Sequence, residues 1–200
     1  ELLNLGKKNQ LEVKVAKESA NRSINAAERK ADWWLFGGIY RPVWLEVLPQ
    51  IHMEHFVLNA DHQGKLQAAV DMAGDAKGHE IIVSVRSLKD GKTVYTSNGQ
   101  TTITHSISNS DKEQMISGEW ASIIPWSTEN PNLYVAKLEL KNPEGKIVQT
   151  RETRIGFRTV EFFPQDGVYL NGTKLVVKGI NRHSFSVDGG RTTSAALSRM

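Results

Sequence analysis

The sequence contains no cysteine among its 200 residues. This absence excludes disulfide cross-links, a catalytic thiol and a thiolate metal site, although it leaves the cellular compartment open. Long apolar runs are also absent, and none approaches the roughly 20 residues that a membrane-spanning helix needs. The net charge is only +3. Because Lys and Arg are interspersed with Asp and Glu, the basic stripe of a nucleic-acid-binding protein is missing, and we expect neither a nucleic acid nor a membrane as partner.

A protein-bound metal is not expected either. The six histidines are scattered along the chain. His52 and His55 are three residues apart, but they lie in a strand-like region, where this spacing places them on opposite faces.

Much of the sequence alternates between apolar and polar residues, the pattern of strands that are buried on one face. Turn-forming pairs such as Asp90-Gly91, Asn98-Gly99 and Asn171-Gly172 separate these runs. The alternating apolar positions include Leu11, Val13, Val15, Ala68, Val70, Met72, Ile81, Val83, Val85, Tyr134, Ala136, Leu138 and Leu140. Short strands with frequent turns predict a β-sandwich.

Residues 18–31 are the one stretch with helical propensity. Ile24 is their only large apolar residue, so a helix would have no face to bury, and we interpret the stretch as an ordered loop.

Three segments follow from these patterns. Residues 1–48 contain strands without an obvious first one. Residues 49–157 hold enough strands for an immunoglobulin-like sandwich. Residues 158–200 contain a hairpin, a strand that leads to Asn181-Arg182-His183, and the first turns of a helix with Ser194 as its N-cap. A strand followed by a helix is the opening of a βα unit.

Three motifs resemble glycoside hydrolase family 2 in the same order. The first, residues 32–45, begins Asp-Trp-Trp and contains Gly-Gly-Ile-Tyr-Arg. The second, residues 126–134, runs from Trp-Ser to Pro-Asn-Leu-Tyr. The third extends from Gly-Phe-Arg at 156–158 through Leu-Asn-Gly at 170–172 to His183. The resemblance implies a mainly β fold in which residues 1–48 end a jelly-roll sugar-binding domain, 49–157 form an immunoglobulin-like domain, and 158–200 begin a β/α barrel.

The resemblance also implies residues that contact a sugar. His183, as a neutral imidazole, can donate one hydrogen bond and accept another, although a structural histidine is the alternative. Asn181 is a further candidate, and Arg182 either contacts substrate or pairs with a carboxylate of the barrel.

Two more candidates come from the first motif. Asp32 matches an aspartate that β-galactosidases of this family extend into the active site, where a carboxylate can accept two vicinal hydroxyls; a loop cap is the alternative. Trp33 could stack on a sugar ring or seal the space between jelly-roll and barrel.

Family 2 enzymes are expected to hydrolyse β-linked sugars with retention, using two carboxylates about 5–5.5 Å apart. The family's acid/base follows an asparagine, and none of the glutamates in this chain does. Both catalytic carboxylates are therefore expected outside residues 1–200, and this fragment is expected to be inactive. Mg²⁺ and Na⁺ sites of some relatives would likewise have most of their ligands elsewhere.

The partner implied by the resemblance is a carbohydrate such as a β-galactoside. Glycone preference (galactose, mannose, glucuronic acid or glucosamine) stays open, as do a homo-oligomeric parent and a periplasmic or secreted location. One alternative is a non-catalytic immunoglobulin-like module for carbohydrate binding or adhesion, and another is a cell-surface interaction domain without a sugar role. The first of these alternatives gives no reason for residues 179–183.

Overall fold

The chain is described by a computed structural model that covers residues 4, 6–29, 37–39 and 41–199. It divides into two compact units. Glu46–Lys178 form one, here called the sandwich unit, and Glu1–Leu45 together with Gly179–Met200 form the other, here called the flanking unit.

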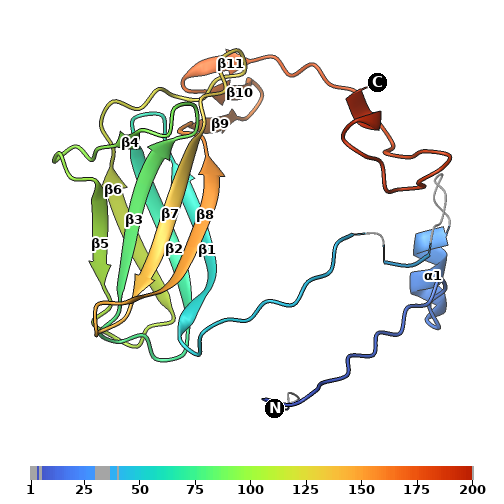
Figure 1. Ribbon diagram of the computed structural model, residues 1–200. Coiled ribbons are helices and arrows are strands. Elements are labelled where there is room, and N and C mark those ends of the chain that lie inside the picture. Colours follow the sequence, from blue (N-terminus) through green and yellow to red (C-terminus); the bar gives the residue numbers. More distant parts are fainter. Residues whose placement is uncertain (1–3, 5, 30–36, 40, 200) are drawn as a thin grey trace. The chain divides into compact units, whose positions relative to one another are not determined.

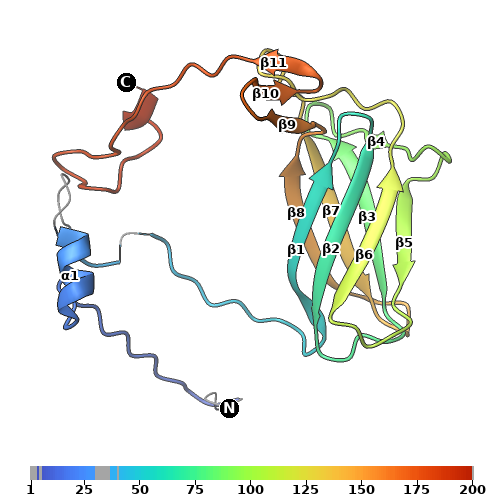
Figure 2. The same ribbon diagram turned by 180° about the vertical axis from the view of Figure 1, so that it is seen from behind.

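The sandwich unit contains two antiparallel sheets packed face to face (Figures 1 and 2). The first sheet has the strand order β1-β2-β6, and its strands are His52–Ala60, Lys65–Ala73 and Glu113–Glu119. The second has the order β4-β3-β7-β8, with β5 also paired to β3, and its strands are Thr93–Val94, Glu80–Ser87, Tyr134–Lys141, Ile147–Ile155 and Thr102–Ser106. This arrangement confirms the predicted mainly β sandwich.

The core lies between the two sheets and consists of the alternating apolar side chains. Val70 of β2, Val83 of β3 and Leu138 of β7 are completely buried. Opposed residues of neighbouring strands point to the same face, so the pairings Val83 with Leu138 and Ile81 with Leu140 place large side chains in adjacent rows of one core. The alternation predicted for β2, β3 and β7 is therefore confirmed.

A second, small sheet belongs to the same unit and has the order β9-β10-β11, with strands Val160–Phe163, Gly167–Leu170 and Thr173–Leu175. It lies beyond the end of β8 (Figures 1 and 2). Its hairpin turns at Asn171 and Gly172, whose φ angles are +50° and +77°. Two consecutive positive φ angles are typical of the tight hairpin turn that an Asn-Gly pair predicts.

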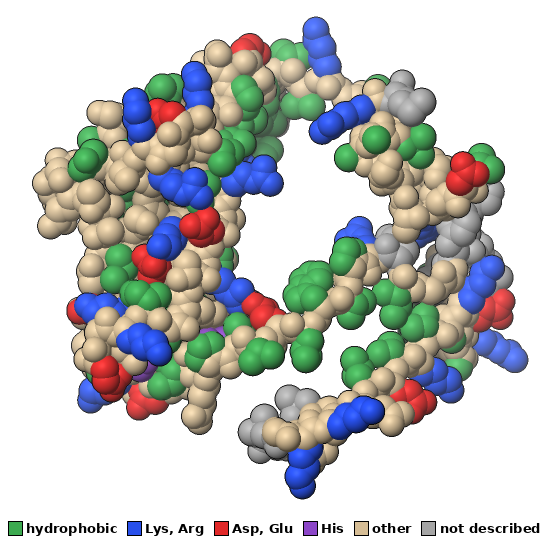
Figure 3. All heavy atoms as spheres, in the orientation of Figure 1, with side chains coloured by type: hydrophobic (Ala, Val, Ile, Leu, Met, Phe, Trp, Pro, Cys, Tyr) green, Lys and Arg blue, Asp and Glu red, His purple; other side chains and the backbone are tan. Residues whose placement is uncertain are grey.

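One face of the small sheet is apolar and only partly covered. Pairing in register places Val160, Phe162, Val168, Leu170 and Leu175 on this face, together with the polar Thr173. Leu170 is buried, whereas Phe162 is 76% exposed. Figure 3 shows hydrophobic side chains on the surface at this end of the sandwich.

Helix α1 (Arg22–Arg29) lies in the flanking unit and corrects the prediction of a loop over 18–31. The Asn21 Oδ1 atom accepts hydrogen bonds from the backbone N–H groups of Ser23 and Ile24 at 3.0 and 3.3 Å. Such an N-cap satisfies donors that the first helical turn leaves free. Local capping therefore supports a short helix although Ile24 stays half exposed.

The strand predicted around Leu11, Val13 and Val15 is not formed: residues 8–16 have no strand partner within the described part of the chain. These side chains are 82%, 59% and 50% exposed. An alternating pattern produces a strand only where a neighbouring backbone can pair with it, and no such neighbour is described here.

The strand predicted to precede Asn181 is also not formed, since residues 176–185 have no regular structure. Val176 and Ile180 are 76% and 91% exposed. The predicted helix is a single 3-10 turn, η1 (Leu197–Arg199), whose Leu197 N–H donates to Ser194 Oγ at 3.1 Å, as expected for the cap. No helix within the described ranges is long and apolar enough to cross a membrane.

Candidate functional site

Three of the predicted sugar-contacting residues, Asn181, Arg182 and His183, lie consecutively in an exposed segment of the flanking unit. Arg182 Nη1 donates a hydrogen bond to the backbone oxygen of Ser198 at 3.3 Å. This contact connects the segment to the η1 turn. The side chains of Asn181 and His183 are exposed, so a ligand can reach their hydrogen-bonding groups.

Asp32 and Trp33, the other two predicted contacts, lie outside the described residues. The five assignments of sugar-contacting residues therefore stay predictions.

Two turns shape the chain after His183. The backbones of Ser186 and Gly190 pair in both directions, and the Gly189 N–H donates to Ser186 Oγ at 3.0 Å. The Thr192 N–H then donates to Gly189 O at 2.9 Å. Side-chain hydroxyls that satisfy backbone groups in this way stabilise turns locally.

The second and third motifs meet in space at the end of the sandwich that carries the small sheet. The Trp126 N–H donates to Phe157 O at 2.9 Å, and the Phe157 ring packs edge-on against Tyr134 with ring centres 5.2 Å apart. The guanidinium of Arg158 lies over the Trp126 ring at 5.1 Å, a cation–π distance. Motifs that are thirty residues apart in the sequence thus form one contact region.

Gly156 is required by this packing. A Cβ atom at position 156 would lie 3.0 Å from the Trp126 Cβ and 3.1 Å from its ring. The indole therefore occupies the space that a side chain would need, which gives this glycine a steric role rather than a conformational one.

Asn171 joins the small sheet to the same region. Its Nδ2 donates to Trp126 O at 3.0 Å, and its Oδ1 accepts from the Thr159 N–H at 2.9 Å. The backbone N–H of Asn171 donates to Thr159 O, also at 2.9 Å. One carboxamide thus connects the loop before β7, the segment after β8 and the β10–β11 turn.

His62, in the β1–β2 turn, completes the region from the other sheet. Its Nδ1 lies 2.6 Å from Thr159 Oγ1, and its backbone N–H donates to the same hydroxyl at 3.3 Å. The Arg158 N–H donates to Ala60 O at 2.9 Å. We call the set Trp126, Gly156, Arg158, Thr159, Asn171 and His62 the junction. Sequence reasoning identified its motifs, but it gave His62 no role there.

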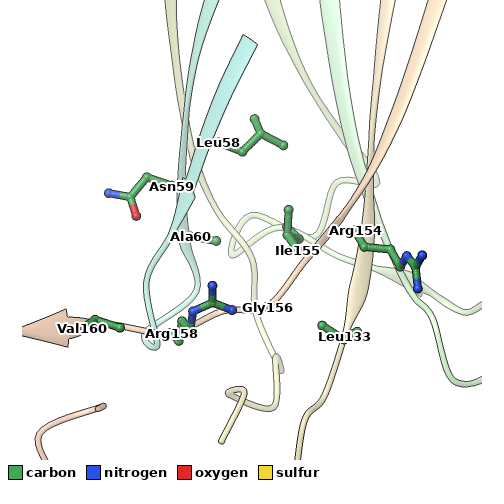
Figure 4. A pocket seen from close by; sticks show the side chains of 9 residues that line it. All are labelled: Leu58, Asn59, Ala60, Leu133, Arg154, Ile155, Gly156, Arg158 and Val160. Carbon is green, nitrogen blue, oxygen red and sulfur yellow. The ribbon is translucent and has the colours of Figure 1, made fainter. Parts of the chain in front are cut away.

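A hollow of about 380 Å³ opens beside the junction and is lined by Leu58, Asn59, Ala60, Leu133, Arg154, Ile155, Gly156, Arg158 and Val160 (Figure 4). The side chains of Asn59 and Arg154 point away from it in opposite directions. Convergent polar groups are what fix a ligand in a pocket. Here Asn59 and Arg154 diverge, and the Arg158 guanidinium already lies over the Trp126 ring.

The small sheet has an electrostatic contact of its own. Lys174 Nζ and Tyr169 Oη each donate to Asp166, both at 2.6 Å. The hydrogen bond from Lys174, which has the larger effect, and the one from Tyr169 both lower the pKa of the Asp166 carboxyl. The hydrogen bond to Asp166 in turn raises the pKa of Tyr169. Among the described residues, no group of three His, Asp or Glu side chains is placed to hold a metal ion.

Residues 51–158 match the family described as Glycosyl hydrolases family 2. This match covers more than half of the chain and most of the β-sandwich, and the chain belongs to this family. Beta-galactosidase BgaC of Bifidobacterium adolescentis is 31% identical over 167 residues, which is 80% of this chain and 15% of that protein. A beta-galactosidase of Halalkalibacterium halodurans is 29% identical over 188 residues, 92% of this chain and 18% of its own length.

Solved structures show the same fold. Beta-glucuronidase 3 of Bacteroides uniformis has a TM-score of 0.62 at 26% identity and covers 84% of this chain and 20% of its own. The beta-glucuronidase of Parabacteroides merdae has a TM-score of 0.64 at 24% identity, and the match covers 84% of this chain and 21% of that protein. The chain spans about a sixth of the length of the two β-galactosidases named above.

Proposed function

We propose that the chain is the central portion of a retaining glycoside hydrolase that cleaves β-linked sugars, with a β-galactoside as the preferred substrate. The observation that carries this proposal is the family membership, together with four β-galactosidase relatives that are 29–31% identical over 80–92% of this chain. The immunoglobulin-like domain holds the motifs of the junction, and the sugar is bound by residues on either side of it.

Retaining hydrolysis requires a nucleophilic carboxylate and an acid/base about 5–5.5 Å away. The junction contains no carboxylate, and Asp166 is occupied by Lys174 and Tyr169. The reaction is thus assigned to carboxylates elsewhere in the full-length protein. Recognition residues alone contribute binding without protonating a leaving group.

Asp32 separates the two substrate classes suggested by the names of the relatives. A carboxylate that accepts hydrogen bonds from two sugar hydroxyls suits a neutral glycone such as galactose. The same carboxylate would repel the carboxylate of a glucuronide, since like charges a few Å apart disfavour one another. Asp32 therefore favours a galactoside in this proposal, and Trp33, Asn181, Arg182 and His183 complete the recognition of the sugar.

An activity assay tests the proposal directly. The full-length protein is expected to release nitrophenol from a β-galactoside faster than from a β-glucuronide or β-mannoside, and residues 1–200 alone are expected to release none. Asp32→Ala should lower galactoside hydrolysis at least about a hundredfold if the carboxylate binds the sugar in the transition state, about 2.7 kcal/mol. Turnover by residues 1–200, or a rate unchanged by Asp32→Ala, would contradict the respective assignment.

A further inference from the structure

The junction is held together by side-chain and backbone hydrogen bonds between segments that are far apart in the sequence. It joins four segments, which are the β1–β2 turn, the loop before β7, the segment after β8 and the turn of the hairpin, and its Arg158 also contacts Ala60 at the end of β1. We propose that Asn171 is a positioning residue: its carboxamide holds the small sheet and the sandwich as one rigid body and thereby fixes where the chain leaves β11 toward Asn181, Arg182 and His183. The last step rests on the proposed function, whereas the rigid junction does not.

Two separate requirements meet at position 171. The backbone has a φ of +50°, which asparagine tolerates better than most residues. The side chain meanwhile needs a donor for Trp126 O and an acceptor for the Thr159 N–H. Glycine would satisfy the first requirement and lose both side-chain bonds. Aspartate would keep the acceptor and lose the donor.

The neighbouring contacts explain why the carboxamide matters for the position of the whole sheet. Thr159 is fixed to the first sheet by His62, and Trp126 is fixed to Phe157 and Arg158. Asn171 therefore connects two groups that are themselves held by the sandwich. Without its side chain, the hairpin turn would be attached to the sandwich mainly through the backbone pairing of residues 159 and 171 and the buried Leu170.

The distance along the chain makes a displacement relevant to the sugar-contacting segment. β11 ends at Leu175, and Asn181 follows six residues later. Six residues span at most about 20 Å when fully extended. A change in the orientation of the small sheet therefore changes the starting point of a short connection, and near-attack geometry is sensitive to shifts of about 1 Å.

Spin labels can measure the rigidity of the junction, and the absence of cysteine allows two labels to be placed without background reaction. Thr150 on β8 and Thr173 on β11 are both exposed. In the 200-residue chain, a Thr150→Cys/Thr173→Cys pair should give a distance distribution as narrow as a reference pair within the sandwich, Thr150→Cys/Ser117→Cys.

The test variants are Asn171→Gly, which keeps the turn, and Asn171→Asp, which keeps one of the two bonds. Both should widen the sandwich-to-sheet distribution about twofold or more, and glycine should do so more than aspartate. The matched control is Asn142→Gly, which removes a side-chain hydrogen bond to Lys146 N in a different turn and should leave the width unchanged. Unchanged widths in both Asn171 variants, or equal widening by Asn142→Gly, would overturn the rigid junction.

The positioning step is tested in the full-length protein. Asn171→Gly should lower kcat about tenfold or more, with a smaller effect on KM and with the folded fraction retained, whereas Asn142→Gly should match the wild type. Widened distributions together with an unchanged kcat would overturn the positioning role. A wild-type protein without any glycosidase activity would contradict the proposed function instead, and the label distances would still decide the rigid junction.

Discussion

The sandwich unit and the flanking unit contain similar apolar side chains but bury them to very different degrees. Leu138 in β7 is completely buried, whereas Leu11 in the flanking unit is 82% exposed. Both lie in alternating sequences that predict a strand. The difference is that β7 has the neighbours β3 and β8, while the described part of the chain provides no neighbour for residues 8–16. Burial depends on the partner strand as well as on the pattern.

The small sheet lies between these extremes. It pairs its own three strands and buries Leu170, but it leaves Phe162 mostly exposed. Polar contacts at Asn171 and Asp166 stabilise it where apolar burial is incomplete. The comparison therefore predicts that truncation of an apolar side chain lowers the free energy of unfolding most in the sandwich. The stability of the small sheet should instead depend more on the charge of Asp166.

The largest expected effect is in the core. Leu138→Ala should lower the free energy of unfolding by about 3–5 kcal/mol, because it removes a completely buried side chain and leaves a cavity. Leu11→Ala is the matched substitution in the flanking unit, and it should change the free energy of unfolding by no more than about 0.5 kcal/mol. Urea unfolding followed by intrinsic tryptophan fluorescence, to which the buried Trp120 contributes, measures both. Similar losses from both substitutions would break the comparison.

Sequence reasoning succeeded where local pattern and available partners agreed. The alternation in β2, β3 and β7 and the Asn171-Gly172 turn were predictable because each is specified by adjacent residues. Helix α1 was not predicted because its sequence has no apolar face to bury. The helix forms nevertheless, and the side chain of Asn21 caps its first turn. The strand at Leu11 was wrong because the pattern does not say whether a partner is present.

The candidate site shows the same division. The motifs around Trp126, Gly156 and Asn171 could be recognised in the sequence, but their contact depends on how β7 and β8 bring distant segments together. His62 had no sequence signal, since its role depends on a hydrogen bond to Thr159, ninety-seven residues away. The adjacent pair Asn171-Gly172 predicted the turn, but it did not predict which groups the Asn171 side chain binds.

An intermediate effect is expected at the junction. Gly156→Ala should lower the free energy of unfolding by about 1–3 kcal/mol, because the added methyl group would press against Trp126. Gly179→Ala is the matched change in the flanking unit: a Cβ there has no neighbour within 4 Å, and its effect should be within about 0.5 kcal/mol. Denaturant unfolding of both variants gives the comparison, which a neutral Gly156→Ala would contradict.

The smallest effect is the pH response of the small sheet. The Asp166 pKa is lowered below its ordinary value of 3.8 in the folded state, so its contribution to stability is complete above that value. The contribution is then lost as the pH falls from about 4 through the folded-state pKa, because protonation removes the charge that Lys174 and Tyr169 bind. Amide exchange in β10 and β11 should accelerate in this range relative to β3 and β7.

Asp166→Asn separates this carboxyl from the other acids of the chain. It keeps the size of the side chain, removes the charge and should abolish the extra acceleration of β10 and β11 below pH 4, while exchange in β3 and β7 follows the wild type. High salt should weaken the wild-type response, because the pair is exposed and therefore screened. An acid response of the same size in Asp166→Asn would mean that burial of Leu170, rather than the charge, stabilises the small sheet, which would then resemble the sandwich in how it is held together.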